Sequence, residues 1–231
     1  GGVVRLRLSA YGCTANEWPC EAFSESFTPG VDVLTGGVRA APPVANPAEA
    51  RREAVRPPRQ AMRGGRHIFT DGSGRGGWGF VAVDIDGSTE EACAEACGPV
   101  VLERAAPPWL GAARATNNTA ELTALAEALH MLLESPVDGH VVLRPDSTYA
   151  IDAMLGSDAP RRNKQLVAAL RALWVRVQAQ YRGRAWALHV RAHRGHKWNE
   201  RADALAGKGA GGGVWAQHSV RWRAWPPLPP P

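Results

Sequence analysis

The chain has 231 residues, of which 45% are hydrophobic and 21% charged, and its formal net charge is +5. This length allows one sizeable domain with extensions, or two small domains, and the positive charge allows a polyanionic partner without identifying one. No apolar run is long enough to span a membrane, no secretory segment opens the sequence, and four cysteines without a CxxC pair do not indicate a disulfide framework.

Residues 1–63 have no regular pattern and are rich in Gly, Pro and, from Arg51 to Arg63, Arg. We predict that this N-terminal extension is a linker or a poorly ordered arm. The sequence does not begin with Met, which is compatible with a fragment of a longer protein.

Three strands are predicted next. Residues 67–70 form a short apolar strand that ends at Asp71, and residues 79–85 and 91–97 form the second and third strands, with an Asp-Gly hairpin turn at 86–87. The period of a strand places Cys93 and Cys97 on one face. We interpret both as small apolar residues, with zinc binding as the alternative.

Leucines at helical spacing from Leu122 to Leu133 predict a helix, with Asn118 or Thr119 as its cap. A strand, a short helix, an amphipathic helix, a strand and a last helix follow, over residues 140–144, 151–155, 166–177, 186–191 and 199–206. This order predicts an α/β domain with a five-stranded mixed sheet flanked by helices. Residues 209–231 form a Gly/Trp/Pro-rich tail, for which stacking on nucleic acid or docking on a partner stays open.

Four acidic residues occupy positions at which they could share one site. Asp71 and Asp146 each follow a predicted strand, Glu121 lies in the first turn of a helix, and Asp203 lies within the last helix. Ligand sites in open α/β sheets gather at the carboxyl ends of strands. Clustered carboxylates repel one another unless cations neutralise them, and such oxygen ligands favour Mg²⁺ or Mn²⁺. The alternative is that they are solvated surface groups, as most of the 22 acidic residues are.

The residues around these acids form four short motifs. They are Phe-Thr-Asp-Gly-Ser at 69–73, Thr-Asn-Asn-Thr-Ala-Glu-Leu at 116–122, Asp-Ser-Thr-Tyr at 146–149, and His-Arg-Gly-His-Lys-Trp-Asn-Glu-Arg-Ala-Asp-Ala-Leu-Ala at 193–206. In this order they resemble the motifs of the ribonuclease H family, type 1. The resemblance covers about residues 64–208 and implies the three-layer RNase H-like fold for that segment.

The resemblance implies an endonuclease that hydrolyses the RNA strand of RNA–DNA hybrids and leaves 5′-phosphate and 3′-hydroxyl ends. Asp71, Glu121, Asp146 and Asp203 would hold two Mg²⁺ ions, for which Mn²⁺ could substitute, with Asp71 bridging both. One ion would activate the attacking water and the other would stabilise the leaving oxygen. His193 would position water or assist product release, its alternative being an exposed loop histidine.

The resemblance also implies contacts with the hybrid, where a 2′-hydroxyl distinguishes RNA from DNA. The residues at such positions are Gly72, Ser73, Asn117, Asn118, Thr148 and Asn163. Candidates for phosphate binding, each of which could equally be an ordinary surface charge, are Arg161, Arg162, Lys164, Arg194 and Lys197.

This sequence departs from the family pattern in four places. The loop after Asp71 is short and glycine-rich and lacks an asparagine that many bacterial relatives carry, Pro145 ends a strand, and the segment between residues 155 and 166 is too short for a basic handle. Residues 101–115 resemble an insertion, with Pro107-Pro108-Trp109 as a surface loop.

Three alternatives remain at this point. The first is a DNA-directed enzyme of the same fold, such as a transposase, integrase, resolvase or exonuclease, and the second is a catalytically silent module that only binds nucleic acid. The third concerns context, since a retrotransposon polyprotein with a reverse transcriptase would suit the motifs as well as a cellular enzyme of the nucleus or cytoplasm. The oligomeric state is open.

Overall fold

The structure is a computed structural model that describes residues 52, 56–106, 108–156, 160–192 and 194–216, with only the backbone of residues 215 and 216. Every described residue belongs to the unit Pro43–Pro231. The predictions for residues 1–51, for His193 and for the end of the tail therefore lie outside the described residues. No described helix is long and apolar enough to cross a membrane.

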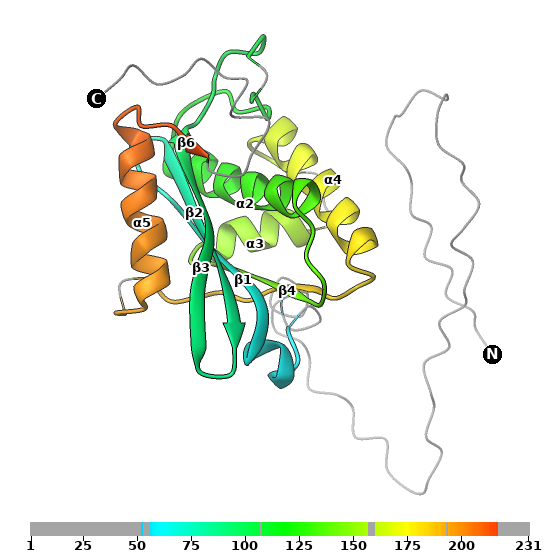
Figure 1. Ribbon diagram of the computed structural model, residues 1–231. Helices are drawn as coiled ribbons and strands as arrows, with labels where there is room; N and C mark the ends of the chain where they lie inside the picture. The colour runs from blue at the N-terminus through cyan, green and yellow to red at the C-terminus, as the bar shows by residue number, and fades with distance from the viewer. Residues whose placement is uncertain (1–51, 53–55, 107, 157–159, 193, 217–231) are drawn as a thin grey trace, which may run out of the picture. The chain divides into compact units, whose positions relative to one another are not determined.

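One mixed sheet forms the centre of this unit, with the strand order β5-β4-β1-β2-β3-β6 (Figure 1). The strands are β1 (Gly64–Gly72), β2 (Gly77–Asp86), β3 (Thr89–Pro99), β4 (Val141–Pro145), β5 (Ala185–Ala187) and β6 (Trp215–Ala216). The β1–β2 and β2–β3 pairs are antiparallel, whereas β4 is parallel to both β1 and β5. The predicted five-stranded mixed sheet is confirmed, and the short β6, which pairs with β3, is an addition that the sequence did not indicate.

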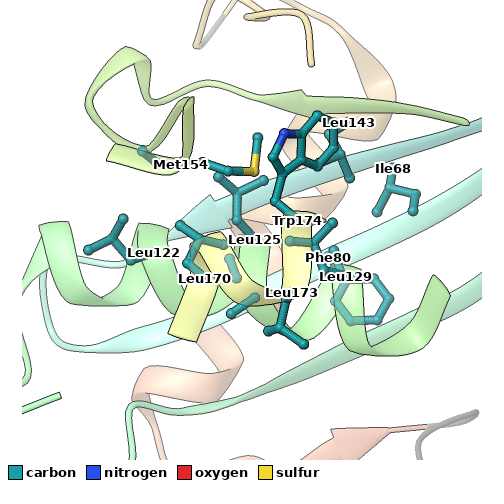
Figure 2. Close-up of a cluster of buried hydrophobic side chains, with 14 of the residues drawn as sticks. Ile68, Phe80, Leu122, Leu125, Leu129, Leu143, Met154, Leu170, Leu173 and Trp174 are labelled. Atoms are coloured by element: carbon teal, nitrogen blue, oxygen red, sulfur yellow. The ribbon is translucent and has the colours of Figure 1, made fainter. Parts of the chain in front are cut away.

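Helices cover both faces of the sheet and make the domain three-layered (Figure 1). The helices are α2 (Asn117–Glu134), α3 (Thr148–Leu155), α4 (Lys164–Gln180) and α5 (Lys197–Ala210). The larger core lies between one sheet face and α2, α3 and α4, and Figure 2 shows part of it, from Ile68 of β1 to Trp174 of α4. The smaller core joins Phe69 and Val81 to Leu205 of α5 on the other face.

The start of α2 is fixed by a capping box at Thr116. Its hydroxyl accepts the backbone N–H of Thr119 at 3.2 Å, and the Thr119 hydroxyl accepts the N–H of Thr116 at 2.8 Å. The prediction that Asn118 or Thr119 is the cap was therefore wrong, because Thr116 has the extended backbone of a cap and Thr119 serves as its reciprocal partner. This start places Glu121 one turn into the helix.

Helix α5 lies directly on β2 because small residues face each other there. A Cβ atom at Gly79 would come within 2.5 Å of the backbone nitrogen of Ala206 and 2.6 Å of the Cβ of Leu205. Gly77 meets the backbone of Ala206 and Ala210 still more closely. Glycines on the strand thus allow the close approach that brings α5, and Asp203 with it, to the sheet.

A β-bulge in β3 overturns the prediction that the two cysteines share one face. Ala82 pairs with Ala94 and Val83 pairs with Ala92, so Cys93 is the extra residue of the bulge. Cys93 consequently packs toward the larger core, whereas Cys97 belongs to the smaller core beneath α5. The strict period of a strand does not hold across the extra residue.

Pro145 is the last residue of β4, where the sheet tolerates it. It has no N–H to donate, but its carbonyl accepts the N–H of Val190 at 2.9 Å, and Leu143 accepts the N–H of Leu188 in the same way. The strand predicted over residues 186–191 is therefore shorter than expected, since regular pairing ends at Ala187 and single hydrogen bonds continue along β4.

The start of the folded unit and one predicted loop differ from what the sequence indicates. The short helix η1 (Arg59–Met62) belongs to the folded unit, because Ala61 is 2% exposed and its carbonyl lies 3.0 Å from Nε2 of His67. Pro108 is buried and Trp109 is half-buried, so the described residues of the predicted surface loop do not lie fully at the surface.

Candidate active site

Three of the predicted carboxylates meet at the carboxyl ends of the neighbouring strands β1 and β4. Asp71 lies near the end of β1, Asp146 directly follows the parallel neighbour β4, and Glu121 approaches from α2. One oxygen of each lies within 4.8 Å of the others. Among the described residues, these three form the one group of Asp, Glu, His or Cys side chains that lie close enough together to hold a metal ion.

Asp203 lines the same cleft but stands outside this tight group. It is exposed on α5, and its negative charge contributes to the raised pKa of Asp71. The fold thus brings all four predicted carboxylates to one cleft. Three of them have oxygens within 4.8 Å of one another, and the fourth, Asp203, comes from α5 on the other face of the sheet.

Gly72 makes the approach of β1 to α2 possible. A Cβ atom at this position would collide with the backbone of Glu121 and would come within 2.9 Å of the Cβ of Ala120. The N–H of Gly72 also donates a hydrogen bond of 2.6 Å to Oδ1 of Asp71. A glycine directly after Asp71 therefore both orients that carboxylate and leaves room for Glu121.

Burial and mutual repulsion raise the pKa values of the clustered carboxyls. Burial, followed by the charge of Asp146, raises the pKa of Asp71 to about 7. Burial, followed by the charges of Asp146 and Asp71, raises the pKa of Glu121 to about 9, and burial also raises the pKa of Asp146. A site that disfavours its own charged form in this way needs cations to hold the carboxylates ionised at neutral pH.

The donor set fits a divalent cation. Glu121 is 5% exposed, and its Oε2 is buried without a hydrogen-bond partner in the described structure. An unsatisfied acceptor beside two further carboxylates matches the all-oxygen coordination that hard cations prefer. The cluster is therefore suited to a divalent metal site.

Two residues that the sequence analysis did not single out hold Asp146 in place. Asn199 of α5, 2% exposed, donates from Nδ2 to Oδ2 of Asp146 at 3.4 Å. Nε2 of His189 lies 2.9 Å from the backbone carbonyl oxygen of Asp146. The spacing of Asn199 and Asp203 within one motif, four residues apart and hence on one helix face, is the signal that could have found Asn199.

Five of the six predicted substrate contacts line two adjoining depressions. Gly72, Ser73, Asn117 and Thr148 line the carboxylate cleft, whereas Asn118 lines a neighbouring groove, and Tyr149 lines both. Asn163, which has a left-handed backbone before α4, donates a hydrogen bond from Nδ2 to the Tyr149 hydroxyl at 3.3 Å.

The predicted phosphate-binding cations are not gathered in one place. Arg161 and Arg162 line the neighbouring groove, whereas Arg194 lines a separate depression. Lys164 is exposed at the start of α4, and Lys197 forms an ion pair of 2.8 Å with Glu90 of β3.

The mixed sheet, its two helical layers and the acidic cleft define an α/β domain with carboxylates suited to metal binding. A family model described as RNase H matches residues 64–211. Curated ribonucleases H from Herminiimonas arsenicoxydans and Agrobacterium fabrum are 34% and 36% identical over 160 residues, and each alignment covers 62% of this chain and 92% of the relative. The chain belongs to the ribonuclease H family.

Solved structures with a related fold include two ribonucleases H. LC9-RNase H1 gives a TM-score of 0.45 at 20% identity, covering 69% of this chain and 80% of that chain. LC11-RNase H1 in complex with an RNA/DNA hybrid gives a TM-score of 0.44 at 22% identity, covering 64% of this chain and 97% of that chain.

Proposed function

We propose that this chain is a ribonuclease H that hydrolyses the RNA strand of RNA–DNA hybrids, with Asp71, Glu121, Asp146 and Asp203 as the ligands of two Mg²⁺ ions. The observation that carries this proposal is the cluster of three carboxylates within 4.8 Å, which lies in the segment that the RNase H family model matches. Cations held there would lower the pKa of an attacking water and stabilise negative charge on the leaving oxygen.

The side chains around the cleft would place the scissile phosphate. Ser73, Asn117 and Thr148 line it and offer polar groups to the sugar–phosphate backbone, with the amide of Asn117 able to donate to a 2′-hydroxyl. Asn199 would keep Asp146 oriented toward the cation, and Gly72 would do the same for Asp71. His193, which lies outside the described residues, is proposed to position water or assist product release.

The comparisons give no support to the retrotransposon alternative. The curated relatives are ribonucleases H of bacteria, and this chain covers 92% of the length of the two named above. We therefore favour a cellular ribonuclease H over a domain of a polyprotein with a reverse transcriptase.

Cleavage of a labelled RNA–DNA hybrid in Mg²⁺ tests the proposal, with double-stranded RNA and double-stranded DNA as parallel substrates. We expect hybrid-specific cutting, and a loss of roughly a hundredfold or more in Asp71→Asn, because the variant removes a ligand at the centre of the cluster. Asp138→Asn makes the same chemical change at an exposed position before β4, at the other end of that strand, and should cut like the wild type.

Two results would replace the proposal. Binding of the hybrid without cutting, in Mg²⁺ and in Mn²⁺, would indicate the silent binding module. Cutting of double-stranded DNA in preference to the hybrid would indicate a DNA-directed nuclease.

A further inference from the structure

A groove adjoins the carboxylate cleft along α3 and the start of α4. We call it the basic groove, and the residues that define it are Asn118, Tyr149, Asp152, Arg161, Arg162 and Arg171. Tyr149 lines both the groove and the cleft and is 37% exposed, so a strand that leaves the cleft meets an aromatic ring and then guanidinium groups. Arg171 is held in place by a hydrogen bond of 2.8 Å from Nε to the carbonyl of Ala153.

Among the described residues that line this groove, Asp152 is the one carboxylate. An uncompensated carboxylate there would repel a phosphate and would compete with it for the neighbouring guanidinium groups. The structure pairs it instead, because one terminal nitrogen of Arg52 lies 2.8 Å from Oδ1 and 2.7 Å from Oδ2 of Asp152. Both side chains are partly exposed, at 27% and 34%.

Arg52 comes from outside the segment that the family model matches, which begins at residue 64. It lies within the arginine-rich stretch from Arg51 to Arg63 that the sequence analysis interpreted as linker or arm. Its ion pair joins Arg52 to Asp152 of α3, beside the groove.

We propose that Arg52 completes the basic groove as a binding surface for the phosphate backbone of the hybrid by neutralising Asp152. The ligand class is a sugar–phosphate strand that extends beyond the bond being cut. This inference rests on the proposed function, since it concerns how the same substrate is held.

Fluorescence anisotropy with a labelled hybrid in the absence of metal, at low and at physiological salt, tests this inference without cleavage. We expect Arg52→Ala to bind the hybrid roughly two- to fivefold more weakly at low salt, the scale of one partly exposed ion pair. The double variant Arg52→Ala/Asp152→Asn should recover wild-type affinity, because the charge that needed neutralising is gone. The turnover number at saturating hybrid in Mg²⁺ should stay unchanged in both.

Arg59→Ala is the matched control, because it also removes one arginine but at an exposed position of η1, before the start of β1, whereas the cleft lies at the end of β1. Equal weakening by Arg52→Ala and Arg59→Ala would reduce the effect to net charge and overturn the inference. Wild-type affinity in Arg52→Ala, or failure of the second substitution to restore binding, would overturn it too. A wild type that binds the hybrid but does not cut it would overturn the proposed function and leave this binding test intact.

Discussion

Asn199 and Asp203 lie one helical turn apart on α5, so this helix contributes to the acidic cleft in two ways. Asp203 brings a carboxylate, and Asn199 brings a neutral donor that holds a carboxylate of another element, Asp146. A neutral amide suits this position because the cleft already contains four carboxyl groups, and a further acidic group would add to the repulsion between their charged forms.

Asn199→Asp should weaken the binding of Mn²⁺ by roughly ten- to a hundredfold, the usual cost of losing a residue that orients a metal ligand. The substitution removes the donor to Asp146 and places another carboxylate beside it. Isothermal titration calorimetry measures this directly. Glu200→Gln, at the exposed neighbouring position of α5, should bind Mn²⁺ as the wild type does, and equal affinity in all three proteins would refute the orienting role of Asn199.

At the scale of elements, the contact between α5 and β2 positions the fourth carboxylate. The stripe of Ala202, Ala206 and Ala210 recurs every four residues, and the backbones of all three face the glycines of β2. The distance between helix and sheet is thus set by the absence of Cβ atoms on the strand. Any added volume there must move α5 as a whole.

Gly79→Ala should lower the free energy of unfolding by about 1–3 kcal/mol, since a new Cβ would overlap the backbone of α5. Because α5 carries Asp203, we also expect weaker Mn²⁺ binding. Gly207→Ala is the control, as its Cβ would meet no atom within 4 Å and alanine favours helix. Urea denaturation measures the first effect, and a Gly79→Ala protein as stable as Gly207→Ala would contradict the packing argument.

The sequence was informative where local patterns and motifs coincide. Apolar periodicity predicts the five main strands and the main helices. The short motifs around them predict the four acidic positions, Asp71, Glu121, Asp146 and Asp203. Features that depend on contacts distant in sequence could not be predicted in this way. The bulge at Cys93 is visible only in the pairing of β3 with β2, where the register shifts between Ala82 and Val83, and β6 forms by pairing with β3.

Side-chain partnerships were harder still to predict. Arg52 and Asp152 are separated by 100 positions, and nothing in either local sequence indicates the other. The cap at Thr116 was missed because several neighbouring residues could serve as a cap, and only the backbone angles show which of them does.

At the scale of the whole molecule, the raised pKa values link metal binding, pH and stability. Asp71 shifts from 3.8 to about 7 and Glu121 from 4.5 to about 9 in the metal-free fold. The folded protein therefore binds these protons more tightly than the unfolded chain does. Their stabilising contribution is complete below about pH 4 and is lost as the pH rises through 7 and 9.

We therefore expect the melting temperature gained on adding Mn²⁺ to grow as the pH rises from about 5 to about 8, because protons compete with the cation for the same oxygens. Differential scanning calorimetry with and without Mn²⁺ isolates this effect from other titrating groups. Asp71→Asn should lose most of the gain. A gain independent of pH would show that the ion binds elsewhere.

The bulge of β3 also bears on how the protein behaves when concentrated. An open sheet can grow by pairing its edge strand with that of another copy, which needs a long regular row of backbone donors and acceptors. Within the described residues, the row along β3 is interrupted at Cys93, and β6 occupies Ala96 and Cys97, while β5 at the other edge is only 3 residues long. Neither edge of the described sheet offers a long regular strand to a second sheet, so these irregularities oppose edge-to-edge pairing.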